Sequence, residues 1–312
     1  MWRGWQTRYT YIRSPQPSAS APPIILVHGF GASLGHWRHN LPVLGQHHLV
    51  YALDLLGFGG SEKVQTAYQV ALWGEQVYDF WQTFIRQPVV LVGNSLGSLV
   101  CLEVAATHPE IVAGVAMLNL PDASVLTSTW PQWCQRAIAP VNYVLRPVLH
   151  LLGSLLTLPP IFNPFFGWIR QPAIIGFWAK QAYTNPEAVT DELVEILSAP
   201  AYDRGAARAL AAMTQSRSSD PAAAATVRLP RLQMPLLLIW GQQDRLVPST
   251  LAPLFCRYNA QLQLVELATV GHCPHDESPE QVNQLLLNWM ATHWGASGGD
   301  RSQSGSPSNL LG

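Results

Sequence analysis

Six short apolar runs, separated by segments long enough for a helix, constrain the fold of this chain most strongly. The runs are residues 24–28, 49–54, 89–93, 112–118, 236–240 and 262–267. Continuous apolar runs of this length are typical of parallel strands that are covered on both faces. A segment rich in β-formers at 5–13 predicts one more strand. The segments that predict helices are 35–45, 68–87, 96–107, 249–258 and 279–293. This alternation predicts a doubly wound α/β sheet.

The alternation stops between about residues 121 and 232. This interval contains Trp130, Trp133, Trp168 and Trp178. From Pro121 to Pro186 it has five charged side chains, which are Asp122, Arg136, Arg146, Arg170 and Lys180. We therefore predict a helical cap, or lid, at 121–232, inserted into a core domain of residues 1–120 and 233–294. Glycine and serine dominate the tail at 295–312, which we expect to be disordered.

The uncharged run from Pro147 to Ile169 is long enough to raise the question of a membrane span. It is interrupted by glycine and by three prolines, at positions 153, 159, 160 and 164. We therefore expect cap helices here rather than a transmembrane helix. The aromatic, weakly charged cap also predicts peripheral contact with a membrane.

Composition excludes several classes of function. Lys and Arg number 18 and Asp and Glu 19, giving a net charge of −1, which argues against a nucleic-acid partner. The four cysteines form no CxxC pair and no metal-ligand spacing. We therefore expect no metal and no cofactor, and free thiols in a reducing compartment. The start of the chain has no apolar secretory segment. These features predict an intracellular protein, cytoplasmic or peripheral on an internal membrane.

The clearest chemical signal is Gly93-Asn94-Ser95-Leu96-Gly97, which follows one apolar run and begins a predicted helix. A G-x-S-x-G motif between a strand and a helix is typical of a nucleophile elbow. The two glycines leave room for the sharp turn, and the turn exposes Ser95 at the positive end of the helix. Ser95 is therefore the candidate nucleophile.

A serine hydroxyl needs a base, and the base needs a group that orients it. His272 lies after the last apolar run and is the candidate base, with His275 as the competitor. Asp244 follows the preceding run and is the candidate acid. Asp122, after the run at 112–118, is the alternative acid.

Acyl transfer also needs donors for the oxyanion. We predict that the backbone N–H groups of Leu96 and Phe30 supply them. Leu96 follows the nucleophile, and Phe30 lies in the loop after the run at 24–28. His28 and Asp54 are interpreted as residues that stabilise their loops.

Together these motifs resemble the α/β-hydrolase superfamily over about residues 1–294. HGFG, DLLGFGGS, GNSLG, GQQDRLVP and GHCPHDESPE occur in the order of that family. The resemblance implies an α/β-hydrolase fold with a mostly parallel sheet and a helical cap, and a cofactor-free serine hydrolase. Ser98 departs from the pattern, because many members have a second glycine there.

Within the superfamily, QVYDFW, GNSLGS and LNLPDAS are similar to the pheophytinase and chlorophyll dephytylase group. That resemblance implies hydrolysis of the phytyl ester of chlorophyll-type pigments, and so a thylakoid-type membrane as the location. The alternatives are a general lipophilic carboxylesterase or lipase, a carbon–carbon bond hydrolase of aromatic ring-cleavage products, and an inert binding protein. Ring-cleavage products are dianionic, so such a hydrolase would need cationic groups in its cap, and this cap has few.

Overall fold

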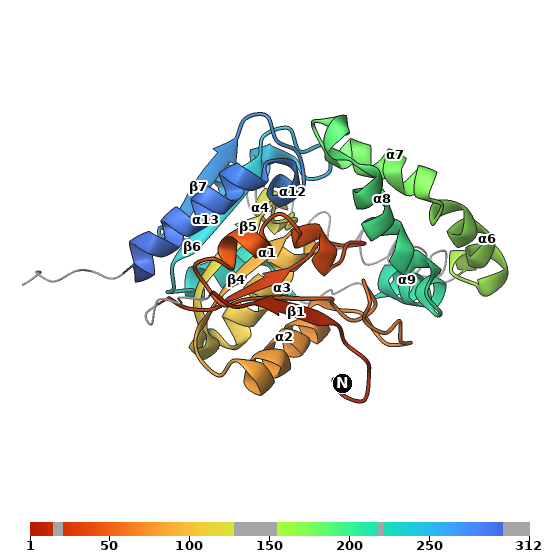
Figure 1. The fold of residues 1–312 in the computed structure, drawn as a ribbon, viewed down its shortest axis with the longest axis horizontal. Coiled ribbons are helices and arrows are strands. Elements are labelled where there is room, and N and C mark those ends of the chain that lie inside the picture. Colours follow the sequence, from red (N-terminus) through yellow and green to blue (C-terminus); the bar gives the residue numbers. More distant parts are fainter. Residues whose placement is uncertain (15–20, 128–154, 217–220, 296–312) are drawn as a thin grey trace, which may run out of the picture.

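The computed structural model describes residues 1–14, 21–127, 155–216 and 221–295. In these residues seven strands form one sheet, in the order β1-β3-β2-β4-β5-β6-β7 (Figure 1). β1 is antiparallel to β3, and all other neighbours are parallel. The strands are β1 (Tyr9–Ile12), β2 (Ile24–Val27), β3 (Val50–Leu53), β4 (Val89–Asn94), β5 (Val112–Leu118), β6 (Leu236–Gly241) and β7 (Leu262–Leu267). The predicted mostly parallel sheet is confirmed.

Helices cover both faces of this sheet. Those that flank it are η1 (Leu34–Trp37), α1 (Leu41–Leu44), α2 (Val70–Phe84), α3 (Leu96–Thr107), η2 (Pro109–Ile111), η7 (Ser249–Leu251), α11 (Ala252–Phe255), α12 (Pro274–Glu277) and α13 (Pro279–Trp294). Alternate residues of each strand enter opposite cores. Ile25 and Val27 of β2 pack in the core with α2 and α3, whereas Ile24 and Leu26 pack in the core with α1 and α13. The strands are therefore apolar throughout because both of their faces are buried.

Two predicted helices are divided in the structure. The segment 35–45 forms η1 and α1, and 249–258 forms η7 and α11. Pro42 and Pro253 lie in the first turns of α1 and α11. Proline is favourable at the start of a helix because its missing N–H has no partner there in any case, but inside a helix it breaks the hydrogen-bond ladder. Each proline therefore begins a new helix rather than continuing one.

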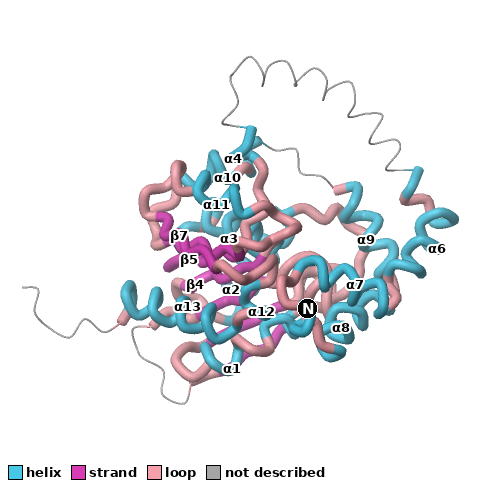
Figure 2. The backbone as a smooth tube through the Cα atoms, turned by 90° about the horizontal axis from the view of Figure 1, so that it is seen from above, coloured by secondary structure: helices cyan, strands magenta, loops and turns pink. Residues whose placement is uncertain are grey.

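A second group of helices lies between β5 and β6 in the chain. It consists of α4 (Ser124–Thr127), α6 (Pro159–Ile169), α7 (Pro172–Ala182), η3 (Pro186–Ala188), α8 (Asp191–Ser198), η4 (Ala199–Tyr202), α9 (Ala206–Gln215), η5 (Pro221–Ala223), α10 (Ala225–Arg228) and η6 (Leu229–Arg231). α6 to α9 gather on one side of the sheet in both views (Figures 1 and 2). The division into a core domain and a cap stays a prediction.

Parts of two predictions fall outside the described residues. These are the tail from residue 296 and the segment with Trp130 and Trp133, together with the first part of the uncharged run. Among the described helices, none combines the length and the hydropathy that crossing a bilayer requires.

The turn from β4 into α3 is tightly packed against the backbone of the sheet. Ser95 has φ 52° and ψ −116°, a conformation that L-residues rarely adopt. A Cβ atom added to Gly97 would lie 2.1 Å from the carbonyl oxygen of Val27, and one added to Gly93 would lie 2.3 Å from the backbone of Gly97. Both glycines are therefore required for α3 to approach β2 and β4 this closely.

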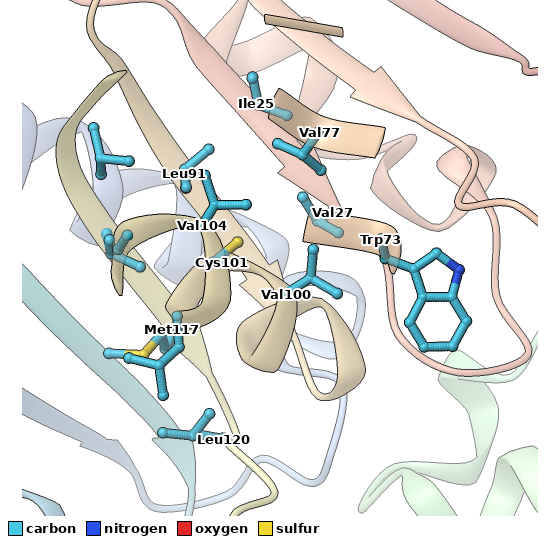
Figure 3. Packing of buried hydrophobic residues seen from close by; sticks show 14 of the residues in the cluster. Ile25, Val27, Trp73, Val77, Leu91, Val100, Cys101, Val104, Met117 and Leu120 are labelled. Atoms are coloured by element: carbon cyan, nitrogen blue, oxygen red, sulfur yellow. The ribbon is translucent and has the colours of Figure 1, made fainter. Parts of the chain in front are cut away.

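The contacts of the Ser98 hydroxyl explain why this position has serine rather than the second glycine of the motif. Its hydroxyl lies 2.7 Å from the carbonyl oxygen of Gly93 and accepts the N–H of Leu118 at 3.0 Å. The hydroxyl thereby joins β4 to β5 directly below the turn. The buried cluster of Figure 3, with Val100 and Cys101 of α3 packed against the sheet, forms the apolar floor beneath it.

Gly97→Ala tests this packing. Because the new methyl group collides with backbone rather than with a movable side chain, we expect a loss of about 3 kcal/mol in the free energy of unfolding. Gly167→Ala is the matched control, since a Cβ there meets nothing within 4 Å and α6 should gain up to about 1 kcal/mol. Urea unfolding followed by circular dichroism measures both, and equal midpoints would contradict the packing argument.

Candidate active site

The strand order places a site at one particular edge of the sheet. From β2 the chain moves to β3 on one side, and from β4 onward it moves to the other side. The loops after β2 and β4 therefore separate, and such a switch point is where open α/β sheets bind ligands. Ser95 follows β4, and the loop at 28–31 follows β2. A Cβ added to Gly29 would lie 3.1 Å from Asn94 Oδ1 and 3.5 Å from Ser95 Cβ, so this loop passes directly beside the serine.

His272 and Asp244 form a buried pair, although they lie 28 residues apart. His272 Nδ1 donates a hydrogen bond to Asp244 Oδ2 at 2.7 Å. The other carboxylate oxygen of Asp244 accepts the N–H groups of Leu246 and Val247, at 2.8 and 2.9 Å. Because Nδ1 donates to the carboxylate, Nε2 is the ring nitrogen that can act as a proton acceptor. The pair has the arrangement of a base and the acid that orients it.

Opposing effects act on the carboxylate of Asp244. Burial raises its pKa, but the hydrogen bond and charge of His272 lower it, as do the N–H of Val247 and the amide of Asn119. The net result is a pKa below the ordinary value of an aspartate. Asp244 is therefore an anion throughout the neutral range, as the orienting role requires.

The sequence analysis did not single out Asn119, which fixes Asp244 from the opposite side. Asn119 follows β5, is fully buried and has φ 50°. Its Nδ2 donates to Asp244 Oδ2 at 2.6 Å and to the carbonyl oxygen of Gly271 at 3.3 Å. One amide thus holds both the acid and the residue before His272. The signal was an asparagine directly after a buried strand, a residue type that tolerates positive φ.

Asn94 also links the two halves of the site. Its Nδ2 donates to the carbonyl oxygen of His272 at 3.0 Å, and it directly precedes Ser95. The backbone N–H of His272 donates in turn to the carbonyl oxygen of Ala182 at the end of α7. The loop that carries His272 is therefore tied both to the strand that carries Ser95 and to the helices between β5 and β6.

Ser95 and His272 line the same cavity, whose volume is about 810 Å³. One side of this cavity consists of residues from the loops after β2, β3, β4, β6 and β7, including Phe30, Phe58 and Cys273. The other side is apolar and comes from the helices between β5 and β6, through Phe165, Phe166, Trp168, Ile169, Ile175, Trp178, Leu197, Leu210 and Met213. The side chains of Ser95 and His272 therefore lie on the wall of one large, mostly apolar chamber.

The loop after β2 orients the N–H of Phe30. Leu55 N–H donates to His28 Nε2 at 3.1 Å, so the ring proton lies on Nδ1, which donates to the carbonyl oxygen of Gly29 at 2.7 Å. Ala32 N–H also donates to that oxygen, at 3.3 Å. In a trans peptide the N–H points away from the C=O, so the N–H of Phe30 points away from the His28 ring. His28 therefore has the loop-stabilising position that we expected.

Leu96, the other predicted donor, is the first residue of α3. The first N–H groups of a helix have no partner within the helix. Its side chain packs against the main core cluster, whereas the Phe30 side chain lines the cavity.

The two alternative residues occupy different surroundings. The carboxylate of Asp122 accepts the N–H groups of Ser124 and Ala225, at 2.8 and 2.7 Å, and so fastens α4 to α10. His275 is fully buried, with its ring 4.2 Å from that of Trp37. Within the described part of the chain, neither of its ring nitrogens has a hydrogen-bond partner. Neither residue lines the cavity.

Charged groups at the cavity are few and engaged. Lys63 binds the carboxylate of Asp203 at 2.7 Å and the carbonyl oxygen of Ser61, and the guanidinium of Arg170 lies 4.6 Å from the ring centre of Tyr202. No cluster of three His, Cys, Asp or Glu side chains with metal-binding geometry occurs among residues 1–14, 21–127, 155–216 and 221–295.

The sheet order, the strained serine turn and the His–Asp pair define the hydrolase class to which this chain is similar. A model of the alpha/beta hydrolase family matches residues 24–285, so the chain belongs to that family. This confirms the resemblance inferred from the motifs.

Individual relatives are more distant. The chain is 27% identical over 318 residues to the chloroplastic pheophytinase of Arabidopsis thaliana, covering 91% of this chain but only 64% of that protein. It is 24% identical to 2-hydroxymuconate semialdehyde hydrolase of Pseudomonas sp. (strain CF600), with 88% of each chain covered. The crystal structure of a serine hydrolase involved in carbazole degradation superposes with a TM-score of 0.71 at 22% identity, covering 93% of this chain and 96% of that one.

The buried histidines around the site predict a dependence of stability on pH. Burial lowers the pKa of His36 to about 4 and that of His275 well below its ordinary value. Between about pH 6.5 and pH 4 the unfolded chain therefore binds protons that the folded chain does not. The free energy of unfolding should fall as pH falls through this window, by about 1.4 kcal/mol per pH unit for each histidine.

His275→Phe isolates one of these groups. Phenylalanine keeps the ring against Trp37 and removes two buried nitrogens that lack partners, so we expect equal or higher stability at pH 7.5. The dependence of the free energy of unfolding on pH between pH 6.5 and 5 should become shallower by the contribution of about one proton, or about 1.4 kcal/mol per pH unit. Urea titrations at a series of pH values measure this slope, and an unchanged slope would contradict a neutral His275 in the folded state.

Proposed function

We propose that this protein is a serine esterase that hydrolyses a bulky, lipophilic ester. The observation that carries the proposal is a single cavity lined by both Ser95 and His272, with Asp244 bound to the far side of the His272 ring. The strained turn exposes the serine, Nε2 is the ring nitrogen of His272 that is not bound to Asp244, and the chamber is large and apolar. A site of this kind suits a substrate with much hydrocarbon and one reactive ester.

In the proposed mechanism Ser95 Oγ attacks the ester carbonyl carbon while His272 Nε2 takes the hydroxyl proton. The carbonyl oxygen becomes an anion that accepts the N–H groups of Leu96 and Phe30. His272 then gives its proton to the departing alcohol oxygen, and the acyl group remains on Ser95. A water molecule, deprotonated by His272, attacks the acyl group and releases the acid. Asp244 holds the ring and stabilises its positive form in both steps.

The proposed substrate is the phytyl ester of a chlorophyll-type pigment. Cavities of about 300–1,000 Å³ bind molecules of drug size, so a chamber of about 810 Å³ has room for a long branched chain. The similarity to a pheophytinase supports this choice. The helices at 155–216 would form the lid that holds the chain, and an internal, thylakoid-type membrane would supply the pigment.

A carbon–carbon bond hydrolase is the second candidate, because a 2-hydroxymuconate semialdehyde hydrolase is among the relatives. A dianionic substrate would need free cations in the cavity. Lys63 is neutralised by Asp203, and Arg170 lies over Tyr202. The charge of the described cavity wall therefore favours a neutral ester.

Ser95→Ala, His272→Ala and Asp244→Asn test the mechanism. We expect each to lower kcat on a p-nitrophenyl ester by about 10³-fold or more, and the double variants to be little worse, because the three residues act as a unit. Asp122→Asn is the matched control for Asp244→Asn and should retain activity, since Asp122 caps a helix away from the cavity. An active Ser95→Ala protein would refute the mechanism. Loss of activity in Asp122→Asn alone would reassign the acid.

Substrate class needs a separate comparison. A pigment extract containing phytylated chlorophyll and pheophytin is incubated with the protein, and free phytol is measured by mass spectrometry beside release of p-nitrophenol. The proposal predicts phytol release that Ser95→Ala abolishes. Turnover of the short ester without phytol would keep the esterase and exclude the pigment.

Asn119 should act as a positioning residue for Asp244. In Asn119→Asp a second carboxyl group replaces the amide whose Nδ2 now lies 2.6 Å from Asp244 Oδ2. Protonated, the new group can still donate; ionised, it repels Asp244. We expect kcat near the wild-type value at acid pH and a decline at higher pH that the wild type lacks. A kcat–pH profile measures this, with Asn119→Ala as the control that loses the donor at every pH. Parallel profiles would indicate a merely structural role.

A further inference from the structure

An exposed apolar surface lies on α6 and α7. It is formed by five large side chains that are each 51–60% exposed, and we call these the α6–α7 apolar surface: Ile161, Phe165, Trp168, Phe177 and Trp178. The three on α6 have the spacing i, i+4 and i+7, so they lie on one face of that helix. Clustered apolar groups of this size are typical of binding surfaces rather than of free protein surface.

This surface adjoins the cavity of the candidate active site. Phe165, Trp168 and Trp178 line the cavity and are exposed as well, whereas Ile161 and Phe177 do not line it. The mouth of the cavity is therefore bordered by the α6–α7 apolar surface. Whatever covers this surface also faces the entrance.

The charge of this part of the chain indicates what covers it. α6, α7 and the turn between them contain two basic side chains and no acidic one. Lys180 is exposed near the end of α7, and Arg170, directly after α6, lies over the ring of Tyr202. Tryptophan beside basic residues is typical of the water–lipid boundary. Because the two helices that carry the surface have basic side chains and no acidic one, an anionic partner is favoured.

We propose that the α6–α7 apolar surface binds an anionic lipid bilayer and that the cavity mouth faces the lipid. The binding of the bilayer is argued from the exposed side chains and the charge of α6 and α7, and does not depend on the proposed function. The further statement, that a lipophilic ester enters the cavity directly from the membrane without crossing water, rests on the proposed function.

Vesicle sedimentation with the full chain tests the proposal. Vesicles of phosphatidylcholine alone are compared with vesicles that also contain phosphatidylglycerol, at low and high salt. We expect stronger binding to the anionic vesicles and weakening by salt, because screening shortens the reach of the basic groups. Phe177→Ser and Ile161→Ser should each lower the partition coefficient roughly tenfold. Lys180→Gln should reduce the difference between the two kinds of vesicle.

Phe84→Ser is the matched control for Phe177→Ser. Phe84 is 49% exposed on α2, against 58% for Phe177 on α7. We expect Phe84→Ser to bind vesicles as the wild type does. Equal losses in the two variants, or equal binding to neutral and anionic vesicles, would overturn the proposal. Self-association that Phe177→Ser abolishes, without vesicle binding, would assign the surface to a second copy instead.

A soluble p-nitrophenyl ester separates this proposal from the proposed function. Phe177 does not line the cavity, so the Phe177→Ser protein should hydrolyse the soluble ester at the wild-type rate although its binding to vesicles is weakened. An inactive wild type that still binds anionic vesicles would refute the esterase and keep the membrane surface. An active wild type that does not bind vesicles would refute the membrane surface and keep the esterase.

Discussion

The close approach of α3 to β2 is the constraint on which the rest of the site depends. Gly97 lies so near the carbonyl oxygen of Val27 that no side chain fits between them. This contact forces the chain to turn sharply after β4 and leaves Ser95 at φ 52°. A strained residue persists only where its surroundings determine it. Here the buried floor beneath the turn and the hydroxyl of Ser98 do so.

Two buried side-chain amides connect the sheet to the other residues of the site. Asn94, at the end of β4, donates a hydrogen bond to the loop that carries His272, and Asn119, after β5, donates one to Asp244. Each amide takes the place of water as the hydrogen-bond donor, and so restricts the orientation of the group that accepts the bond. The bond from Asn119 is to a carboxylate, and buried hydrogen bonds to charged groups contribute about 1.5–3 kcal/mol. The positions of His272 and Asp244 are thus fixed by hydrogen bonds from residues at the ends of β4 and β5.

The fold could be predicted from sequence because its signals are local. Each strand of the parallel sheet is a continuous apolar run, and the G-x-S-x-G motif sits between a run and a helix. Ser95, His272 and Asp244 could be proposed from their places after strands. Asn119 could not be assigned, because its role depends on a contact with Asp244 across 125 residues. The sequence shows Pro42 and Pro253 inside two predicted helices, but whether a proline ends one helix or begins another depends on tertiary packing.

Labelling with a fluorophosphonate tests the central claim most directly. Attack by an activated serine on the probe expels fluoride and leaves a covalent phosphonyl group, which peptide mass spectrometry can locate. The account predicts one rapid modification, on the peptide that contains Ser95, and much slower labelling when His272 is replaced by alanine. Labelling at another serine, or an unchanged rate without His272, would contradict it.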